Sequence, residues 1–339
     1  MFGFSEEIEK NNNSLYILFM KKRTIIILGN GFDLDLGLRT SFRDYLQSTI
    51  HTEFSVNTAT FQKIEDKNKN NWGDIEGVLR ESILDALKSN VDDIDKDINV
   101  TWNMIRKGWG IYLPKYIETV QNILKIEHDY LVKENIFDDF PIRKKSCAYL
   151  LARKIKNWNS VYTFNYTNPT DILFGERFGD INFIHGELTL RKQTQFKAHL
   201  IDKYLALGVD YKRMNEETRK RELLSPIMKL TFMETNSFRD DLNEAMMSAE
   251  NIIFFGHSMS ITDSDYFEDF FHGIIDGLIA DKGFFFITKD SNGLSDIKEH
   301  MSEWEIDFDK LNNSTNKISV IFTDDGIDDE NFKRCLDML

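Results

Sequence analysis

The sequence has little cysteine and proline for its length of 339 residues: it contains two cysteines, four prolines and 18 glycines. Cys147 and Cys335 lie too far apart along the chain for the spacing of a zinc site, and two cysteines give no disulfide framework. A reduced compartment, the cytoplasm, is therefore expected. The low proline and glycine content argues against long disordered linkers.

Positive charge and long apolar runs are also scarce. The chain has 42 Lys and Arg against 56 Asp and Glu, a net charge of −14. Nucleic-acid binding needs clusters of Lys and Arg, so this balance argues against a nucleic-acid partner. No segment approaches the roughly 18 apolar residues of a membrane span, so no membrane partner is expected. The short apolar stretch 15–20 precedes its basic residues, whereas a signal peptide has the reverse order.

Apolar residues are abundant, at 41% of the chain with 27 Phe, which is enough for a large core. Six short apolar runs, typical of strands covered on both faces, alternate with helical patterns. This alternation predicts an α/β fold: a doubly wound, Rossmann-like parallel sheet of about six strands with large helical insertions. The predicted strands are 24–28, 160–164, 181–184, 251–255, 283–288 and 317–322.

The gaps between these runs predict how the chain is divided. Residues 1–19 are expected to be an N-terminal extension, and 20–50 with 159–339 to form a nucleotide-binding core. Residues 51–158 are acidic with helical patterns, which predicts a helical insertion. Residues 188–245 are charged and helix-prone, which is typical of a solvated cap or of a lid over a site.

The first predicted strand ends in Gly29-Asn30-Gly31-Phe32-Asp33. In a strand, tight turn and helix of this kind, the backbone can approach a phosphate because glycine has no Cβ, and the helix N-terminus offers free N–H groups. The third glycine of the usual dinucleotide-binding pattern is absent. The first four residues are nevertheless predicted to bind a nucleotide. Asp33 could hold a ribose or a metal ion, or could cap the following helix.

Polar side chains also follow three further predicted strands. Because the carboxyl ends of parallel strands meet at one edge of a sheet, these residues are expected to gather around a single site with the glycine turn. This convergence is more informative than any one motif. In chain order the residues are Thr163, Asn165, His185, Gly256, His257, Ser258 and Asp265.

Several of these residues have a structural alternative. Asn165 can bind an amide or a ribose, or can close a turn. His185 could be a general base near neutral pH, or a buried structural histidine. His257 and Ser258 could contact a phosphate or ribose, in a loop whose later residues cap the next helix. Glu76 could be a catalytic carboxylate, or could stabilise the first turn of its predicted helix through the helix dipole.

Taken together, these clusters resemble the AbiH family of bacterial abortive-infection proteins. The resemblance runs from about residue 23 to 270 and implies a role in phage exclusion, without a settled chemistry. The segments that carry it are 29–34, 37–42, 72–76, 163–167, 185–186, 256–259 and 265–267.

A more distant similarity to sirtuins and sirtuin-like NAD-degrading domains implies a chemistry. It suggests that NAD is surrounded by the glycine turn, with Asn165 facing the ribose and His185 as the base. The chain departs from that pattern at Asp33, Thr167 and Arg39, which replace a Ser, an Asp and a Pro. The two distant cysteines cannot supply the four zinc ligands of a sirtuin deacetylase, which argues against protein deacetylation.

We therefore predict a cytoplasmic anti-phage effector that binds NAD or a related nucleotide and hydrolyses its nicotinamide–ribose bond, with Asn165, His185, Asp33 and Glu76 as catalytic residues. Two alternatives stay open. One is a Mg²⁺-dependent phosphoester hydrolase of nucleotide or RNA; the other is a non-enzymatic nucleotide-gated sensor. A phage or host protein as trigger and a homo-oligomer are both left open. The magnesium ligands would be Asp33, Glu76, Asp263 and Asp265.

Overall fold

A computed structural model describes the parts of the chain discussed below. The predicted N-terminal extension 1–19 and residues 188–237 of the predicted cap lie outside the described residues. The described residues are 24–70, 75–89, 92–130, 142–155, 160–168, 173, 181–186, 238–312 and 316–339.

The six described strands form a parallel sheet in the order β3-β2-β1-β4-β5-β6. The predicted α/β class and six-stranded parallel sheet are confirmed. Every residue of β1 and β4 is buried, because helices cover both faces and these strands lie in the middle. The bounds are β1 Thr24–Leu28, β2 Ser160–Thr163, β3 Ile181–Phe183, β4 Asn251–Phe255, β5 Gly283–Thr288 and β6 Lys317–Phe322.

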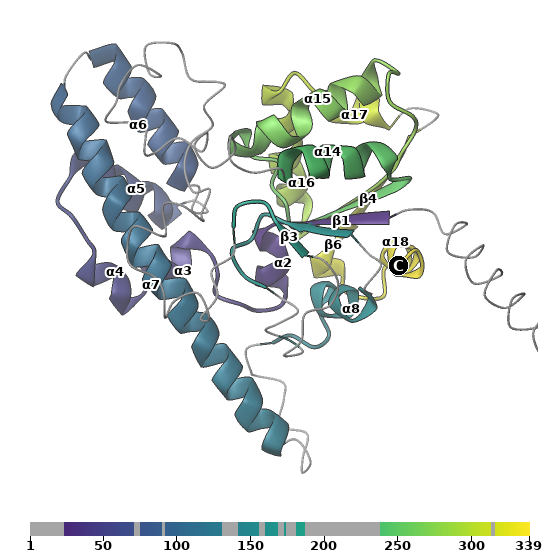
Figure 1. The fold of residues 1–339 in the computed structure, drawn as a ribbon, viewed down its shortest axis with the longest axis horizontal. Helices are drawn as coiled ribbons and strands as arrows, with labels where there is room; N and C mark the ends of the chain where they lie inside the picture. The colour runs from purple at the N-terminus through teal and green to yellow at the C-terminus, as the bar shows by residue number, and fades with distance from the viewer. Residues whose placement is uncertain are drawn as a thin grey trace, which may run out of the picture.

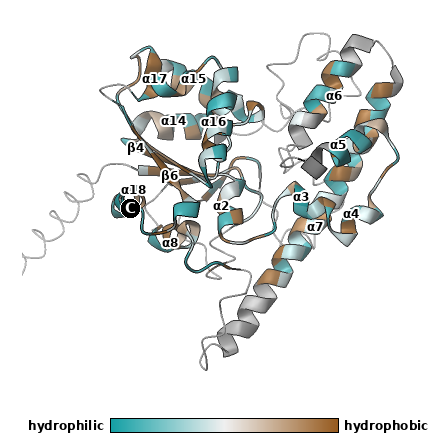
Figure 2. Ribbon diagram, turned by 180° about the vertical axis from the view of Figure 1, so that it is seen from behind, coloured by the Kyte–Doolittle hydropathy of each residue, from teal (hydrophilic) through white to brown (hydrophobic). Residues whose placement is uncertain are grey.

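Alternate side chains of the strands enter two separate hydrophobic cores. Ile25 and Ile27 of β1 point to one face, and Ile26 and Leu28 to the other. Figure 1 shows the two helical layers, and Figure 2 shows hydrophobic strands between them. The first core contains residues of α14 (Phe238–Ser248), α15 (Ser264–Ile275), α16 (Ser291–Glu303) and α17 (Phe308–Leu311); the second contains residues of α2 (Asn30–Asp35), α8 (Cys147–Lys154) and α18 (Glu330–Asp337).

A third core lies within a group of helices beside the sheet (Figure 1). It is built on large aromatic side chains, including Tyr45, Trp102 and Trp109. Although α7 is 39 residues long, neither it nor any other described helix is apolar enough to cross a membrane. These helices are α3 (Phe42–Leu46), α4 (Thr49–Glu53), α5 (Ala59–Asn70), α6 (Ile75–Ser89) and α7 (Asp92–Tyr130).

Three helices near the predicted bounds of the insertion and the cap pack as follows. Helix α3 packs Tyr45 into the third core. Helix α8 packs against the sheet, because its apolar side chains belong to the second core. Helix α14 also packs against the sheet, since Leu242 and Met246 are fully buried there.

The helix that follows the glycine turn is short. Helix α2 begins immediately after Gly29 and is six residues long. The two short helices α3 and α4 follow it. The chain breaks between them at Ser48, whose side chain accepts a hydrogen bond from the backbone N–H of His51 and caps α4.

Helix α7 holds the loop after α2 through two tyrosine hydroxyls. The Tyr112 hydroxyl donates to the carbonyl oxygen of Arg39 at 2.9 Å. The backbone N–H of Arg39 donates to the Tyr116 hydroxyl oxygen at 2.8 Å. The backbone N–H and carbonyl oxygen of Arg39 are thus both hydrogen-bonded to α7, which attaches the insertion to the loop after α2.

The glycines of the first and fourth strand ends pack directly against each other. The Gly31 N–H donates to the Gly256 carbonyl oxygen at 2.9 Å, and the Gly29 N–H donates to Phe255 at the same distance. A Cβ at Gly31 would lie 2.6 Å from the Gly256 Cα, and Gly256 itself has a φ of 63°. Close backbone contact therefore accounts for these glycines. The expected free N–H groups for a phosphate are not present at Gly29 and Gly31, because both donate within the protein.

Gly256→Ala should destabilise the protein strongly. The new Cβ would lie 2.4 Å from the backbone of Gly31, in a left-handed conformation that L-residues disfavour. A loss of about 3 kcal/mol or more in the free energy of unfolding is expected. Gly277→Ala is the matched control, since Gly277 has a φ of 70° with no atom within 4 Å. It should cost about 1 kcal/mol in urea denaturation. Equal losses of unfolding free energy in the two variants would contradict the importance of the close backbone contact between Gly31 and Gly256.

Candidate functional site

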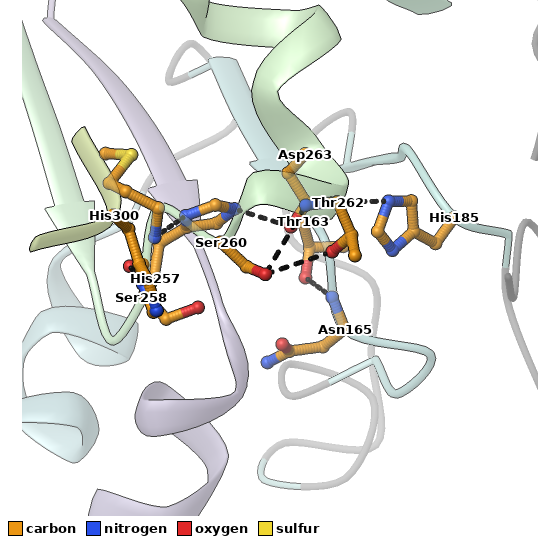
Figure 3. Close-up of polar contacts among 10 residues, drawn as sticks. Thr163, Asn165, His185, His257, Ser258, Ser260, Thr262, Asp263 and His300 are labelled. Carbon is orange, nitrogen blue, oxygen red and sulfur yellow. Dashed lines mark hydrogen bonds and ion pairs between the residues drawn. The ribbon is translucent and has the colours of Figure 1, made fainter. Parts of the chain in front are cut away.

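The C-terminal ends of the first four strands meet at one edge of the sheet, as expected for parallel strands. The Asn165 side-chain amide donates to the carbonyl oxygen of Gly29 at 3.1 Å, which joins the end of β2 to that of β1. The Ile184 N–H donates to the Thr163 carbonyl oxygen, which joins β3 to β2. Figure 3 shows Thr163 and Asn165 with the loop that follows β4. Gly29 and Asn165, which are 136 positions apart in the chain, are therefore neighbours at this edge.

Asp33 is the most deeply buried carboxyl group of this site. Its Oδ1 accepts a hydrogen bond from the Asn165 side-chain amide at 3.1 Å, and its Oδ2 accepts one from the Thr167 hydroxyl. Burial raises the pKa of Asp33 from 3.8 to about 7, although hydrogen bonds from Thr167, Asn165 and Thr40 oppose the shift. Asp33 does not cap α2, whose N-cap is Gly29. Near neutral pH this group can therefore hold or release a proton.

Asn165 is buried and partly unsatisfied. Its backbone N–H donates to the Thr163 hydroxyl oxygen at 3.0 Å, and its side-chain Nδ2 donates to both Gly29 and Asp33. Because the Gly29 carbonyl requires a donor, the amide can be oriented in one way only. Its Oδ1 then has no hydrogen-bond partner among the described residues. A buried acceptor without a partner costs about 1–3 kcal/mol, which a hydroxyl or water donor would recover.

Two histidines contact opposite oxygens of one carboxylate. The distance from His185 Nε2 to Asp263 Oδ1 is 3.2 Å, and from His257 Nε2 to Asp263 Oδ2 it is 3.6 Å (Figure 3). Asp263 ends the short helix η3 (Ile261–Asp263) that follows the β4 loop. The Phe164 ring packs edge-on against both histidines, with centroid separations of 5.0 and 4.5 Å. A buried carboxylate and an aromatic ring thus hold the two imidazoles in place.

The loop after β4 is strained at one residue. Met259 is fully buried and has a φ of 52°, a left-handed conformation that is uncommon for a residue with a side chain. Its N–H donates to His257 Nδ1 at 3.1 Å, and His300 Nδ1 lies 2.8 Å from the carbonyl oxygen of Ser258. The cost of this conformation is offset by the contacts that turn His257 toward Asp263. Strained residues of this kind concentrate at functional sites.

The insertion forms one wall of the site. Helix α6 contacts η3, which carries Asp263. The Tyr166 ring packs against the core of the insertion and lies 6.1 Å from the His185 ring. Arg106 of α7 is buried nearby; burial lowers its pKa, while the neighbouring Tyr166 raises it. The helices between β1 and β2 therefore border the predicted site.

The other predicted residues occupy varied positions. Phe32 is fully buried and packs edge-on against Phe255, so its side chain belongs to the core. Asn30 is half-buried and accepts a hydrogen bond from the Thr40 hydroxyl at 2.9 Å. Ser258 is exposed, and Asp265 is half-buried in the first turn of α15. The side chain of Glu76, in α6, falls outside the described residues.

Two contributors were missed by the sequence analysis. Thr167 binds Asp33, although it was noted only as a departure from a distant pattern. Asp263 was considered as a magnesium ligand and as a helix cap, but it contacts two histidines and makes no side-chain cap bond to α15. Both follow a predicted strand end within a few residues of a chosen candidate. That proximity was the available signal.

The described carboxylates do not form a metal-binding group. Among the residues that the structure describes, no group of three or more His, Cys, Asp or Glu side chains is arranged to hold a metal ion. Asp33 is bound by Asn165 and Thr167, whereas Asp263 faces two histidines. The proposed magnesium ligands are thus divided between two different environments.

Comparison with known proteins adds a family to this geometry. The family model for bacteriophage abortive infection AbiH matches residues 25–276. The chain belongs to the AbiH family. Membership implies a role in abortive infection of phage-infected cells, which agrees with the resemblance seen in the sequence. The AbiH match spans β1 to α15 and so includes the whole candidate site. No curated protein matches the chain, and neither comparison shows the sirtuin-like similarity.

Asp33→Asn should change how the stability of the protein depends on pH. Because the pKa of Asp33 rises from 3.8 to about 7 on folding, the folded protein binds its proton more strongly. The contribution of Asp33 to stability is therefore fully present below about pH 4 and is lost as the pH rises to about 7. The stability of the wild type relative to the Asn variant should fall across this range.

Urea denaturation between pH 4 and 8 measures this difference. Asp269→Asn is the matched control, since Asp269 is exposed on α15. Its curve should run parallel to that of the wild type. A parallel curve for Asp33→Asn as well would contradict the raised pKa.

Proposed function

We propose that this AbiH-family chain is a cytoplasmic abortive-infection effector that binds NAD or a related nucleotide and hydrolyses the nicotinamide–ribose bond. The observation that carries the proposal is the pair of Asp33 and Asn165. A carboxyl group with a pKa of about 7 lies beside a buried carbonyl oxygen that lacks a partner among the described residues. This combination suits a ribose, which offers hydroxyl donors to the oxygen and develops positive charge near the carboxyl group.

The strand order supports a nucleotide as the ligand. The order β3-β2-β1-β4-β5-β6 is that of doubly wound, Rossmann-like sheets, in which dinucleotides bind where the chain order reverses. Here the reversal lies between β1 and β4. The ends of these strands carry Gly29, Gly31 and Gly256, with Asn165 hydrogen-bonded to Gly29. The proposed nucleotide would therefore extend across this edge beside Asn165.

In the proposed reaction the bond from ribose C1′ to the nicotinamide nitrogen breaks, and its electron pair goes to that nitrogen. Nicotinamide is positively charged in NAD and leaves as a neutral molecule, so it needs no acid. Water then attacks C1′ and loses its proton to His185. Asn165 Oδ1 would accept a hydrogen bond from a ribose hydroxyl, and ionised Asp33 would stabilise the oxocarbenium-like transition state. The products are ADP-ribose and nicotinamide.

Incubation of purified protein with NAD tests this reaction through release of nicotinamide. Asn165→Ala and His185→Ala should each lower the rate by ~100-fold or more, because one loses substrate orientation and the other the base. Asn292→Ala is the matched control, since Asn292 is exposed on α16, and it should retain the wild-type rate. Circular dichroism establishes that each variant is folded.

The same assay separates the proposal from its alternatives. Background nicotinamide release by the wild type, both alone and with extract of phage-infected cells as activator, would refute NAD hydrolysis. Phosphoester cleavage that is abolished by chelator would then favour a magnesium-dependent hydrolase. Tight nucleotide binding without any product would favour a nucleotide-gated sensor that recognises a phage or host protein.

A further inference from the structure

We propose that Asp263 is a positioning residue that holds His185 in the tautomer whose basic atom is Nδ1, and that His257 secures Asp263 for this task. The proposal rests on the function proposed above, in which His185 is the base. It identifies Asp263 as the residue that sets the orientation and the tautomer of His185. Three segments contribute: the end of β3, the loop after β4 and the helix η3.

The Asp263 side chain does not act as a helix cap. It occupies the N-cap position of α15, where an Asp side chain commonly accepts hydrogen bonds from the first turn. No such side-chain bond is present. The carboxylate is instead turned toward His185 and His257, with one oxygen for each ring (Figure 3). A preferred local interaction is thus replaced by contacts with two imidazoles.

The tautomer of His257 follows from a backbone contact. Its Nδ1 accepts a hydrogen bond from the Met259 N–H at 3.1 Å, so Nδ1 must carry a lone pair. The ring proton is therefore on Nε2, which faces Asp263 Oδ2 at 3.6 Å. His257 thus presents an N–H group to Asp263 whether or not a ligand is bound.

The tautomer of His185 follows from the other oxygen of the same carboxylate. An ionised carboxylate can only accept hydrogen bonds, so it favours a proton on the facing Nε2, 3.2 Å from Oδ1. The lone pair of neutral His185 is then on Nδ1, away from Asp263. The Tyr166 and Tyr266 rings are also neighbours of His185, each 6.1 Å away between ring centroids. The carboxylate in contact with His185 Nε2 is that of Asp263.

This arrangement has a consequence for proton transfer. When His185 Nδ1 takes a proton from water, the ring becomes positively charged beside the Asp263 carboxylate. The negative charge of the carboxylate stabilises the imidazolium ring, while His257 Nε2 lies 3.6 Å from its other oxygen. Asp263 touches no reacting atom. Its effect on the reaction is exerted entirely through His185.

Asp263→Asn tests the proposal in the full-length protein. We expect kcat for nicotinamide release to fall by ~100-fold or more, because the variant no longer holds His185 in the required tautomer. KM should change by less than about threefold, because substrate binding does not depend on this contact. Asp269→Asn removes an equal charge from the exposed face of α15 and should leave kcat unchanged. Unchanged kcat in Asp263→Asn would overturn the proposal.

A second measurement does not depend on activity. Long-range ¹H–¹⁵N correlation spectra of the wild type report which ring nitrogen of each of the seven histidines carries the proton. His185→Gln and His257→Gln identify the two signals. Both rings should be protonated on Nε2 at neutral pH, and the His185 signal should change in Asp263→Asn. Protonation of His185 on Nδ1 in the wild type would overturn the proposal, even if Asp263→Asn failed to fold.

The two failures are distinguishable. Background nicotinamide release by the wild type together with Nε2-protonated rings would refute the proposed reaction and leave the positioning by Asp263 intact. Normal turnover together with an Nδ1-protonated His185 would refute the positioning and leave the reaction intact.

Discussion

Backbone contact between the loops after β1 and β4 is the constraint on which the site depends. Gly31 and Gly256 touch through main-chain atoms, and a Cβ on either would enter the other loop. This contact brings the loop that carries His257 beside α2, the helix that carries Asp33. Parallel pairing of β1 with both β2 and β4 then brings Asn165 to the same edge. The side-chain contacts of the site thus depend on this close approach of two backbone segments.

Two polar groups of differing character are built on this frame. Asp33 lies among neutral donors, and burial keeps its pKa high. Asp263 faces two imidazoles, each of which presents a nitrogen to it. The same residue type is therefore placed in two different settings: one carboxyl group is surrounded by neutral donors and the other by imidazole rings. Different environments for neighbouring carboxyl groups are a recurrent property of sites that transfer protons.

The sequence predicted the sheet well because buried parallel strands are short, apolar and bounded by turns. All six strands were located to within about one residue, and their parallel direction was also predicted. The contact between Asn165 and Gly29 follows from that direction. The role of the glycines was not predictable in the same way. Gly-x-Gly after a strand indicates close approach of something, and only three-dimensional packing shows that the partner is Gly256. The partnership of Asp263 with two histidines was likewise invisible, since helix capping explains an Asp at that position equally well.

The attachment of α7 to Arg39 links the outer helices to the site mechanically. Tyr112 and Tyr116 form hydrogen bonds with the carbonyl oxygen and the N–H of Arg39, respectively. The neighbouring Leu38 N–H donates to the carbonyl oxygen of Asp33. A continuous path of hydrogen bonds therefore joins the outer helices to the buried acid, from the tyrosine hydroxyls of α7 through the backbone of Arg39 and Leu38 to Asp33.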